Sequence, residues 1–186
     1  GKSTRFAGGN KLSQELLGVP LLTHCYNSIK CSKVAQIVVV SSQENLKQAE
    51  TLSNPYPKIA FVEDNELGIG HSISIGMSFI REEISSVVIC LADMPLITNV
   101  HIQLLLDANK TSYFNQIHRL YDVNNMFGHP ILFNSYYFPK LKRLNGDQGA
   151  YDITLNYKYL INIIKVNNLS VSTDIDTNKD WDNLIL

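Results

Sequence analysis

The stretch SVVICLA at residues 86–92 runs directly into Asp93-Met94-Pro95. Apolar residues on successive positions predict a strand covered on both faces, as in a parallel sheet. QIVVVS at 36–41 shows the same pattern. Because proline cannot continue a central strand, the chain is expected to turn at Pro95. Asp93 is therefore predicted at the carboxyl end of a buried strand, where ligands of α/β sheets bind.

Strand and helix patterns alternate along the rest of the chain. Further strands are expected over 58–62 and 159–166, with helices over 20–31, 43–53, 72–83, 100–109, 148–157 and 179–186. Thr98 is the expected N-cap of the fourth helix. This alternation predicts an α/β fold, a Rossmann-like three-layer α/β/α domain with a mostly parallel sheet. We expect one domain over 1–186, with its first strand before residue 1, because the chain opens on Gly1 without a methionine.

Composition narrows the function classes. Hydrophobic residues make up 45% and charged residues 18% of the 186 residues, which is typical of a globular domain. A net charge of -1 gives no basic field for nucleic acid. No apolar run reaches spanning length and no signal peptide is visible, so we expect a cytoplasmic protein with neither a nucleic-acid nor a membrane partner. Cys25, Cys31 and Cys90 are interpreted as buried thiols.

The opening segment GKSTRFAGGNK at 1–11 combines three glycines with three cations. Glycines let backbone N–H groups approach an anion, and Lys or Arg supplies charge, so the segment suits a triphosphate. It lacks the GxxxxGK[ST] spacing of a P-loop. The alternative is a solvated glycine-lysine turn.

Two acidic loops are candidate metal sites. Asp93 could hold a hard cation that binds phosphate oxygens, or could cap the next helix. Asp174 and Asp176 lie on one face of an extended DID segment, ahead of the last helical stretch. The alternative for this second loop is that Asp176 or Thr177 is only the N-cap of that helix.

Two glycine-containing segments are candidates for binding a substrate. GHP at 128–130 is interpreted as a turn into a strand, in which His129 binds a phosphate or donates a proton, or is a structural hydrogen-bond partner. In GDQGA at 146–150, Asp147 is expected to cap a helix whose N–H groups face an anionic substrate. His71, at a glycine-flexed helix start, is either a ligand or a loop histidine.

Taken in order, these segments resemble the MobA/MocA-like nucleotidyltransferases, especially the molybdenum cofactor cytidylyltransferase branch. The matching residues cover essentially the whole chain: Gly1, Ser3, Arg5, Phe6 and Lys11; GVPLL at 18–22; GIGHSI at 68–73; ADMP at 92–95; GHP at 128–130; LNGDQGA at 144–150; and DIDT at 174–177.

The resemblance implies a Rossmann-like enzyme that moves a nucleoside monophosphate onto a terminal phosphate and releases pyrophosphate. It implies CTP and a phosphorylated, molybdopterin-type cofactor as substrates, Mg²⁺ as cofactor, and a molybdoenzyme or its chaperone as protein partner. Arg5, Lys11 and Asp93 are the implied catalytic residues. The implied nucleotide-binding residues are Gly1, Ser3, Arg5, Lys11, Ser72 and Asp93; those for Mg²⁺ are Asp93 and Asp176; those for the acceptor are His129 and Asp147.

Other functions remain open at this point. A guanylyltransferase, or a cytidylyltransferase for another phosphate, shares the motifs, and residues before Gly1 help to separate these types. A non-catalytic nucleotide or cofactor carrier is a further alternative. A redox relative would need a dinucleotide fingerprint, and the opening loop lacks GxGxxG spacing, although Glu44 follows the strand at 36–41.

Overall fold

The computed structural model describes residues 10–53, 57–63 and 67–185. Its main sheet has the strand order β5 (Ser86–Ile89), β7 (Phe127–Asn134), β6 (Ile117–Tyr121), β8 (Ile161–Lys165). β7 is antiparallel to both β5 and β6, whereas β6 and β8 are parallel. β3 (Val38–Ser42) and β4 (Lys58–Val62) form a separate parallel pair, and β1 (Glu15–Leu16) and β2 (Val19–Pro20) a short hairpin.

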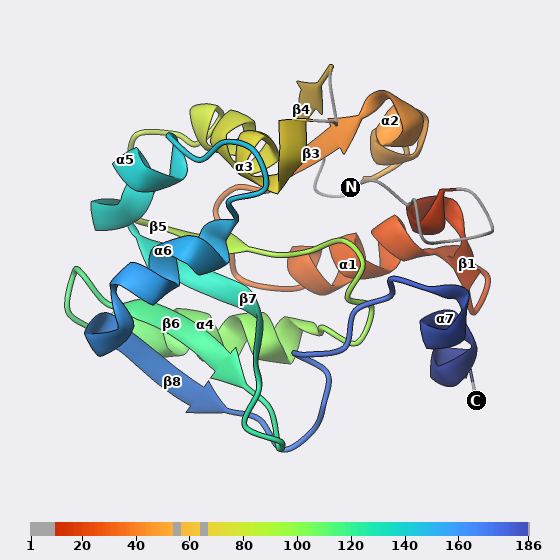
Figure 1. The fold of residues 1–186 in the computed structure, drawn as a ribbon. Helices are drawn as coiled ribbons and strands as arrows, with labels where there is room; N and C mark the ends of the chain where they lie inside the picture. Colours follow the sequence, from red (N-terminus) through yellow and green to blue (C-terminus); the bar gives the residue numbers. More distant parts are fainter. Residues whose placement is uncertain (1–9, 54–56, 64–66, 186) are drawn as a thin grey trace.

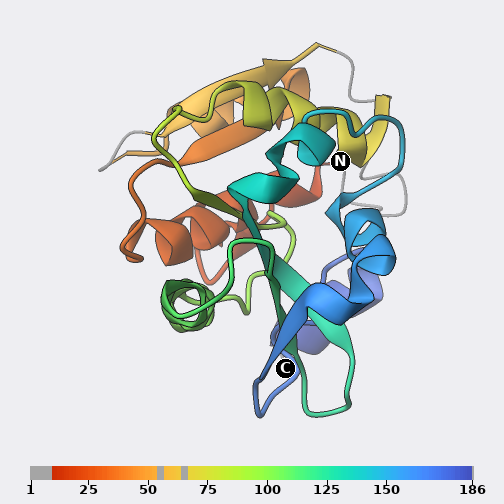
Figure 2. The ribbon, with the colours of Figure 1, turned by 90° about the vertical axis from the view of Figure 1, so that its left-hand side faces the viewer.

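Helices lie on both faces of the main sheet (Figures 1 and 2). They are α1 (Leu21–Lys30), α2 (Gln43–Glu50), α3 (Gly68–Ser78), α4 (Asn99–Lys110), α5 (Phe138–Leu141), α6 (Ala150–Asn156) and α7 (Asn178–Ile185), with 3-10 turns η1 (Lys11–Ser13), η3 (Ser135–Tyr137) and η4 (Lys158–Leu160). α1 and α2 pack with β3 and β4 in a third apolar cluster.

The alternation of side chains along the strands separates the two main cores. On one face, Ile117 of β6 and Phe133 of β7 pack with α3, α5 and α6. On the other face, Leu120 and Leu132 pack with Leu105 of α4. Since strand side chains alternate between faces, each strand of this sheet contributes to both cores. The predicted three-layer α/β/α class is confirmed.

Several local predictions are confirmed and others are wrong. The strand at 58–62 is β4, and Thr98 is the N-cap of α4, in a capping box with His101. The sheet is mixed rather than mostly parallel, because β7 runs against its neighbours. GHP at 128–130 lies inside β7, and the turn comes earlier, at 122–126. Cys31 is exposed rather than buried.

The turn before β7 is held by one carboxylate. Buried Asp122 accepts hydrogen bonds from the backbone N–H groups of Asn124 and Met126, at 2.8 and 2.7 Å. Asn125 takes a positive φ of 65°, which asparagine tolerates better than most residues. This hairpin therefore fixes the register of β6 against β7 and sets the place of the GHP segment.

Candidate functional site

The candidate site begins at Lys11, the first residue of η1. Asn10 caps this turn by accepting a hydrogen bond from Leu12 N at 3.1 Å. The amide of Asn10 also donates to Asn45 Oδ1 on α2 at 2.6 Å. The end of the opening segment is thereby attached to α2, and the Lys11 side chain is directed into the protein, with the residue 7% exposed.

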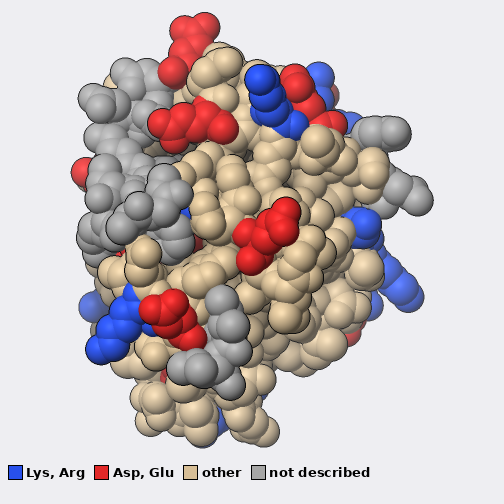
Figure 3. Space-filling view, turned by 90° about the vertical axis from the view of Figure 1, so that its right-hand side faces the viewer, with Lys and Arg blue, Asp and Glu red and all other residues tan. Residues whose placement is uncertain are grey.

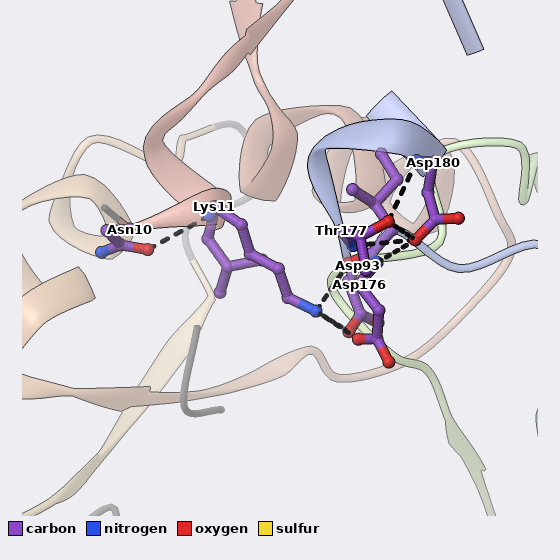
Figure 4. Close-up of polar contacts among 8 residues, drawn as sticks. Asn10, Lys11, Asp93, Asp176, Thr177 and Asp180 are labelled. Atoms are coloured by element: carbon purple, nitrogen blue, oxygen red, sulfur yellow. Dashed lines mark hydrogen bonds and ion pairs between the residues drawn. The ribbon is translucent and has the colours of Figure 1, made fainter. Parts of the chain in front are cut away.

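The Lys11 ammonium lies between two loops that are far apart in sequence (Figure 4). Nζ donates to Asp93 Oδ2 at 2.7 Å, to Asp176 Oδ1 at 3.1 Å and to the Ile175 carbonyl at 2.7 Å. We call Lys11, Asp93 and Asp176 the charge cluster. Burial alone would lower the pKa of Lys11, but the hydrogen bonds and charges of the two carboxylates outweigh it and raise that pKa above its ordinary value.

Backbone contacts hold the two acidic loops together. Ile175 N donates to the Asp93 carbonyl at 3.0 Å, so the DID segment lies against the loop that follows β5. The start of α7 is capped by Thr177 and Asp180: Asp180 Oδ2 accepts from Thr177 N at 2.8 Å, and Asp180 N donates to Thr177 Oγ1 at 3.3 Å. Because Thr177 serves as the cap, the Asp176 carboxylate is directed to Lys11 instead (Figure 4).

One oxygen of Asp93 is suited to a cation. Among the described residues no donor reaches Asp93 Oδ1, although this atom is shielded from solvent. A buried carboxylate oxygen without a partner is costly, and a hard cation would satisfy it. No group of three or more His, Cys, Asp or Glu side chains in the described ranges could hold a metal. Asp93 and Asp176 could together hold an ion such as Mg²⁺, which commonly binds through one or two carboxylates and takes its other ligands from water and phosphates.

Asp174 adds negative charge to the same region. Its pKa is raised by burial first, and then by the charges of Asp176 and Asp93. Asp174 therefore lies within electrostatic reach of the charge cluster, whereas only Asp93 and Asp176 contact the ammonium of Lys11. The region favours cations, and an anionic triphosphate would need Lys11 or a metal ion to bind there.

His129 lies in β7 within electrostatic reach of the charge cluster. Burial, then the charge of Arg119, lowers the pKa of His129 to about 4, against the opposing effect of Asp93. The imidazole is therefore neutral at pH 7, able to donate one hydrogen bond and accept another. His129 N donates to the Val171 carbonyl at 2.9 Å, which ties β7 to the segment leading to Asp176.

Gly128 makes that tie possible. A Cβ at this position would lie 1.5 Å from the Val171 carbonyl oxygen, so only glycine permits the approach. Gly68 and Gly70 have the same role at the start of α3, where a Cβ would lie 2.3 Å from Gly146 O and 2.4 Å from Gln148 O. The glycine segments thus pack backbone against backbone.

The other predicted residues are distributed around this framework. Ser72 and His71 are half-buried in the first turn of α3, and Ser72 Oγ donates to Gly68 O at 3.5 Å. Asp147 is exposed and does not cap α6: the N-cap is Gly149, whose N–H donates to Asp152 Oδ2 at 2.7 Å. In the described part of the chain, neither Ser72 nor Asp147 hydrogen-bonds to the charge cluster. The predictions for Gly1, Ser3 and Arg5 lie outside the described residues.

Arg119, a cation in the centre of β6 that is 3% exposed, was not predicted from the sequence. Its charge lowers the pKa of His129, so the two residues lie within electrostatic reach of each other. The available signal was an arginine within the otherwise half-apolar run IHRLY at 117–121.

Comparison with known families decides the class of the protein. The model of the MobA-like NTP transferase domain matches residues 1–159, a range that includes Lys11, Asp93 and His129. The chain belongs to this family. The MobA-like domain is a nucleotidyltransferase domain, so the charge cluster lies in a nucleotidyltransferase fold.

Individual relatives agree with this assignment. The MobA-like chain is 28% identical over 192 residues to the purine catabolism protein PucB of Bacillus subtilis, covering 98% of this chain and 90% of PucB. The crystal structure of Rv0371c from Mycobacterium tuberculosis superimposes with a TM-score of 0.86 at 19% identity, covering 100% of this chain and 93% of the other. The crystal structure of Rv0371C in complex with manganese gives 0.82 at 18% identity, over 96% and 93%.

The surface of the MobA-like domain carries mixed charge. On the face shown in Figure 3, Lys, Arg, Asp and Glu side chains are scattered over a largely uncharged surface, with an acidic side chain near its centre and no continuous basic band over the part that the structure describes. In the same described residues, helices long and apolar enough to cross a bilayer are absent.

Proposed function

We propose that this protein is a Mg²⁺-dependent cytidylyltransferase that moves CMP from CTP onto the terminal phosphate of a molybdopterin-type cofactor. An oxygen of the acceptor phosphate attacks the α-phosphorus of CTP, the bond from the α-phosphorus to the bridging oxygen breaks, and pyrophosphate leaves. The observation that carries the proposal is the charge cluster, in which one ammonium and two carboxylates converge from the opening segment, the loop after β5 and the DID segment.

Each member of the cluster suits a step of nucleotidyl transfer. Asp93 and Asp176 would hold the cation. The cation would supply the positive charge that neutralises the phosphates as pyrophosphate leaves. Lys11 would bind the triphosphate and then the pyrophosphate, together with Arg5 and the backbone at Gly1 and Ser3. Transfer of this kind depends on alignment and on neutralising charge, with little covalent work by the protein.

The contacts of Lys11 imply that metal and nucleotide bind cooperatively. Its ammonium now donates to the same two carboxylates that the cation would need. A divalent ion held by those carboxylates would repel the ammonium, and the triphosphate would offer that ammonium new acceptors. Nucleotide and metal are therefore expected to bind together more strongly than either binds alone.

Similar proteins and sequence motifs support the finer assignments. The Rv0371C complex contains manganese, which is consistent with a divalent ion in this fold. The GHP and GDQGA segments favour the cytidylyl type over the guanylyl type, with His129 and Asp147 on the acceptor side and Ser72 on the nucleotide side. The relative PucB is named a purine catabolism protein, and we therefore propose that a partner molybdoenzyme of this chain acts on purines.

A thermal-shift comparison of CTP, GTP, ATP and UTP, each with Mg²⁺, tests the base. A ligand that binds only the folded protein adds about 2.7 kcal/mol of stability at a hundredfold excess over its dissociation constant. We expect CTP to raise the melting temperature most, and pyrophosphate release with CTP and the cofactor to confirm transfer. Equal shifts with all four nucleotides would overturn the choice of CTP, and a larger shift with GTP would favour guanylyl transfer.

A further inference from the structure

Arg119 is a buried cation without a counter-ion in the described part of the chain. The residue is 3% exposed, and its Nε is shielded from solvent without an acceptor. Among the same residues, its side chain makes one hydrogen bond, from Nη1 to Thr154 Oγ1 at 3.3 Å. Charged groups are rarely buried unless they are paired, because removing a charge from water costs several kcal/mol. The guanidinium therefore offers unused donors to an anion.

Two aromatic rings provide the cover over this cation. The central guanidinium carbon lies 4.5 Å from the ring centroid of Phe127 and 5.1 Å from that of Tyr151. Cation–π contacts of this kind stabilise a charge less than a charged partner would. The two rings themselves are 39% and 46% exposed. The partly exposed rings of Phe127 and Tyr151 thus lie between the guanidinium and the solvent.

The position of Arg119 places it beside the candidate active site. In the β6–β7 register Arg119 is opposite Ile131, and His129 lies two residues from Ile131 on the same strand. The charges of Arg119 and Asp93 act on the pKa of His129 in opposite directions. Arg119 and Asp93 of the charge cluster therefore lie within electrostatic reach of the same imidazole.

We propose that Arg119 binds a phosphate group of the acceptor, and that Phe127 and Tyr151 stack against a planar ring to which this phosphate is attached. Arginine binds phosphate through paired N–H groups, and exposed aromatic rings favour a flat ligand over an extended one. The assignment to the acceptor rests on the proposed function, whereas the existence of a phosphate site at Arg119 does not.

NMR of arginine Nε–H groups in the intact chain tests the site directly. The Arg119 signal is identified as the one lost in Arg119→Lys, and Arg81, whose Nε contacts Glu83 at 3.1 Å, serves as an internal control. We expect inorganic phosphate to shift the Arg119 signal saturably, and phenyl phosphate to do so at lower concentration. An Arg119 signal that neither ligand moves, or that sodium chloride moves equally at matched ionic strength, would overturn the proposal.

Steady-state kinetics then connects the site to the acceptor. Losing paired hydrogen bonds to a charged group weakens binding about 10- to 100-fold, so Arg119→Lys should raise the acceptor KM by that factor and leave the CTP KM unchanged. An unchanged acceptor KM would refute the role in acceptor binding. Failure of the proposed function can be distinguished from failure of the Arg119 site. If only the proposed function is wrong, nucleotide with Mg²⁺ would not raise the melting temperature of the wild-type protein, but phosphate would still shift the Arg119 signal.

Discussion

Lys11 and Asp93 are 82 positions apart and form an ion pair of 2.7 Å between Nζ and Oδ2. The pair is largely buried, with side chains 9% and 23% exposed. It draws the end of the opening segment to the carboxyl end of β5, where the Asp93 loop also receives Ile175. The contact thus assembles the site before any ligand arrives.

Replacing Lys11 with methionine should weaken the fold and strengthen metal binding. Without the ammonium, Asp93 and Asp176 repel each other, and removing one partner of a partly buried pair costs about 1–3 kcal/mol. The same change removes a competing cation, so Mn²⁺ should bind the nucleotide-free variant about 10-fold more tightly or better. Electron paramagnetic resonance of unbound Mn²⁺ measures this, with exposed Lys47→Met as the control. Weaker Mn²⁺ binding in Lys11→Met would contradict the shared carboxylates.

Replacing Asp93 with asparagine should remove most turnover and leave the fold intact. The amide is nearly the same size but carries no charge for a cation, and losing a group that stabilises transition-state charge typically costs about 10²–10³ in rate. Pyrophosphate release with CTP and Mg²⁺ measures turnover, and circular dichroism checks folding. Asp107→Asn on α4, where the carboxylate is exposed and paired with Lys110, is the control. Near-wild-type turnover in Asp93→Asn would exclude the metal role.

Replacing Gly128 with alanine should destabilise the protein strongly. The new methyl group would overlap the Val171 carbonyl, and relieving the overlap requires β7 and the 169–175 segment to separate. We expect a loss of about 3 kcal/mol or more in the free energy of unfolding, measured by urea denaturation. At Gly149 a Cβ meets nothing closer than 3.5 Å, so Gly149→Ala should cost about 1 kcal/mol or less. Similar costs at the two positions would show that the close approach is not important.

Acidification should destabilise the protein through its neutral histidines. The pKa of His129 is lowered from 6.5 to about 4 by burial first and then by Arg119, and burial also lowers the pKa of His118. Between pH 6.5 and about 4 the unfolded chain binds more protons at His129 than the folded chain does. The contribution of the neutral His129 to the free energy of unfolding is therefore fully present above pH 6.5 and is lost as the pH falls toward 4. Urea denaturation across this range should show a smaller slope for His129→Gln. An unchanged slope would mean that His129 is protonated equally in both states.

Sequence patterns predicted the individual pieces of the site better than their surroundings. The apolar strand before Asp93 and the order of the motifs indicated the candidate loops, and the structure brings Lys11, Asp93 and Asp176 together. Sequence spacing could not show that convergence, because it depends on the Ile175–Asp93 backbone contact.

The wrong predictions have local physical causes. Glycine and proline around His129 are typical of a turn, but here Gly128 allows a crossing backbone to pass while the strand continues. Asp147 precedes a helix start, yet the carboxylate of Asp152 caps Gly149 from inside α6. The arginine within IHRLY at 117–121 did not indicate its surroundings, because the aromatic neighbours of Arg119 come from a different strand and helix.

The hairpin at 122–126 offers a separate opportunity for redesign. Its tip, 123–126, is exposed, whereas Asp122 anchors its base by accepting hydrogen bonds from the turn and from Ser172 Oγ at 2.5 Å. Libraries can therefore vary the tip while keeping Asp122 and Gly128 constant. Variation at those two positions would instead displace the segment that leads to Asp176, and with it the geometry of the charge cluster.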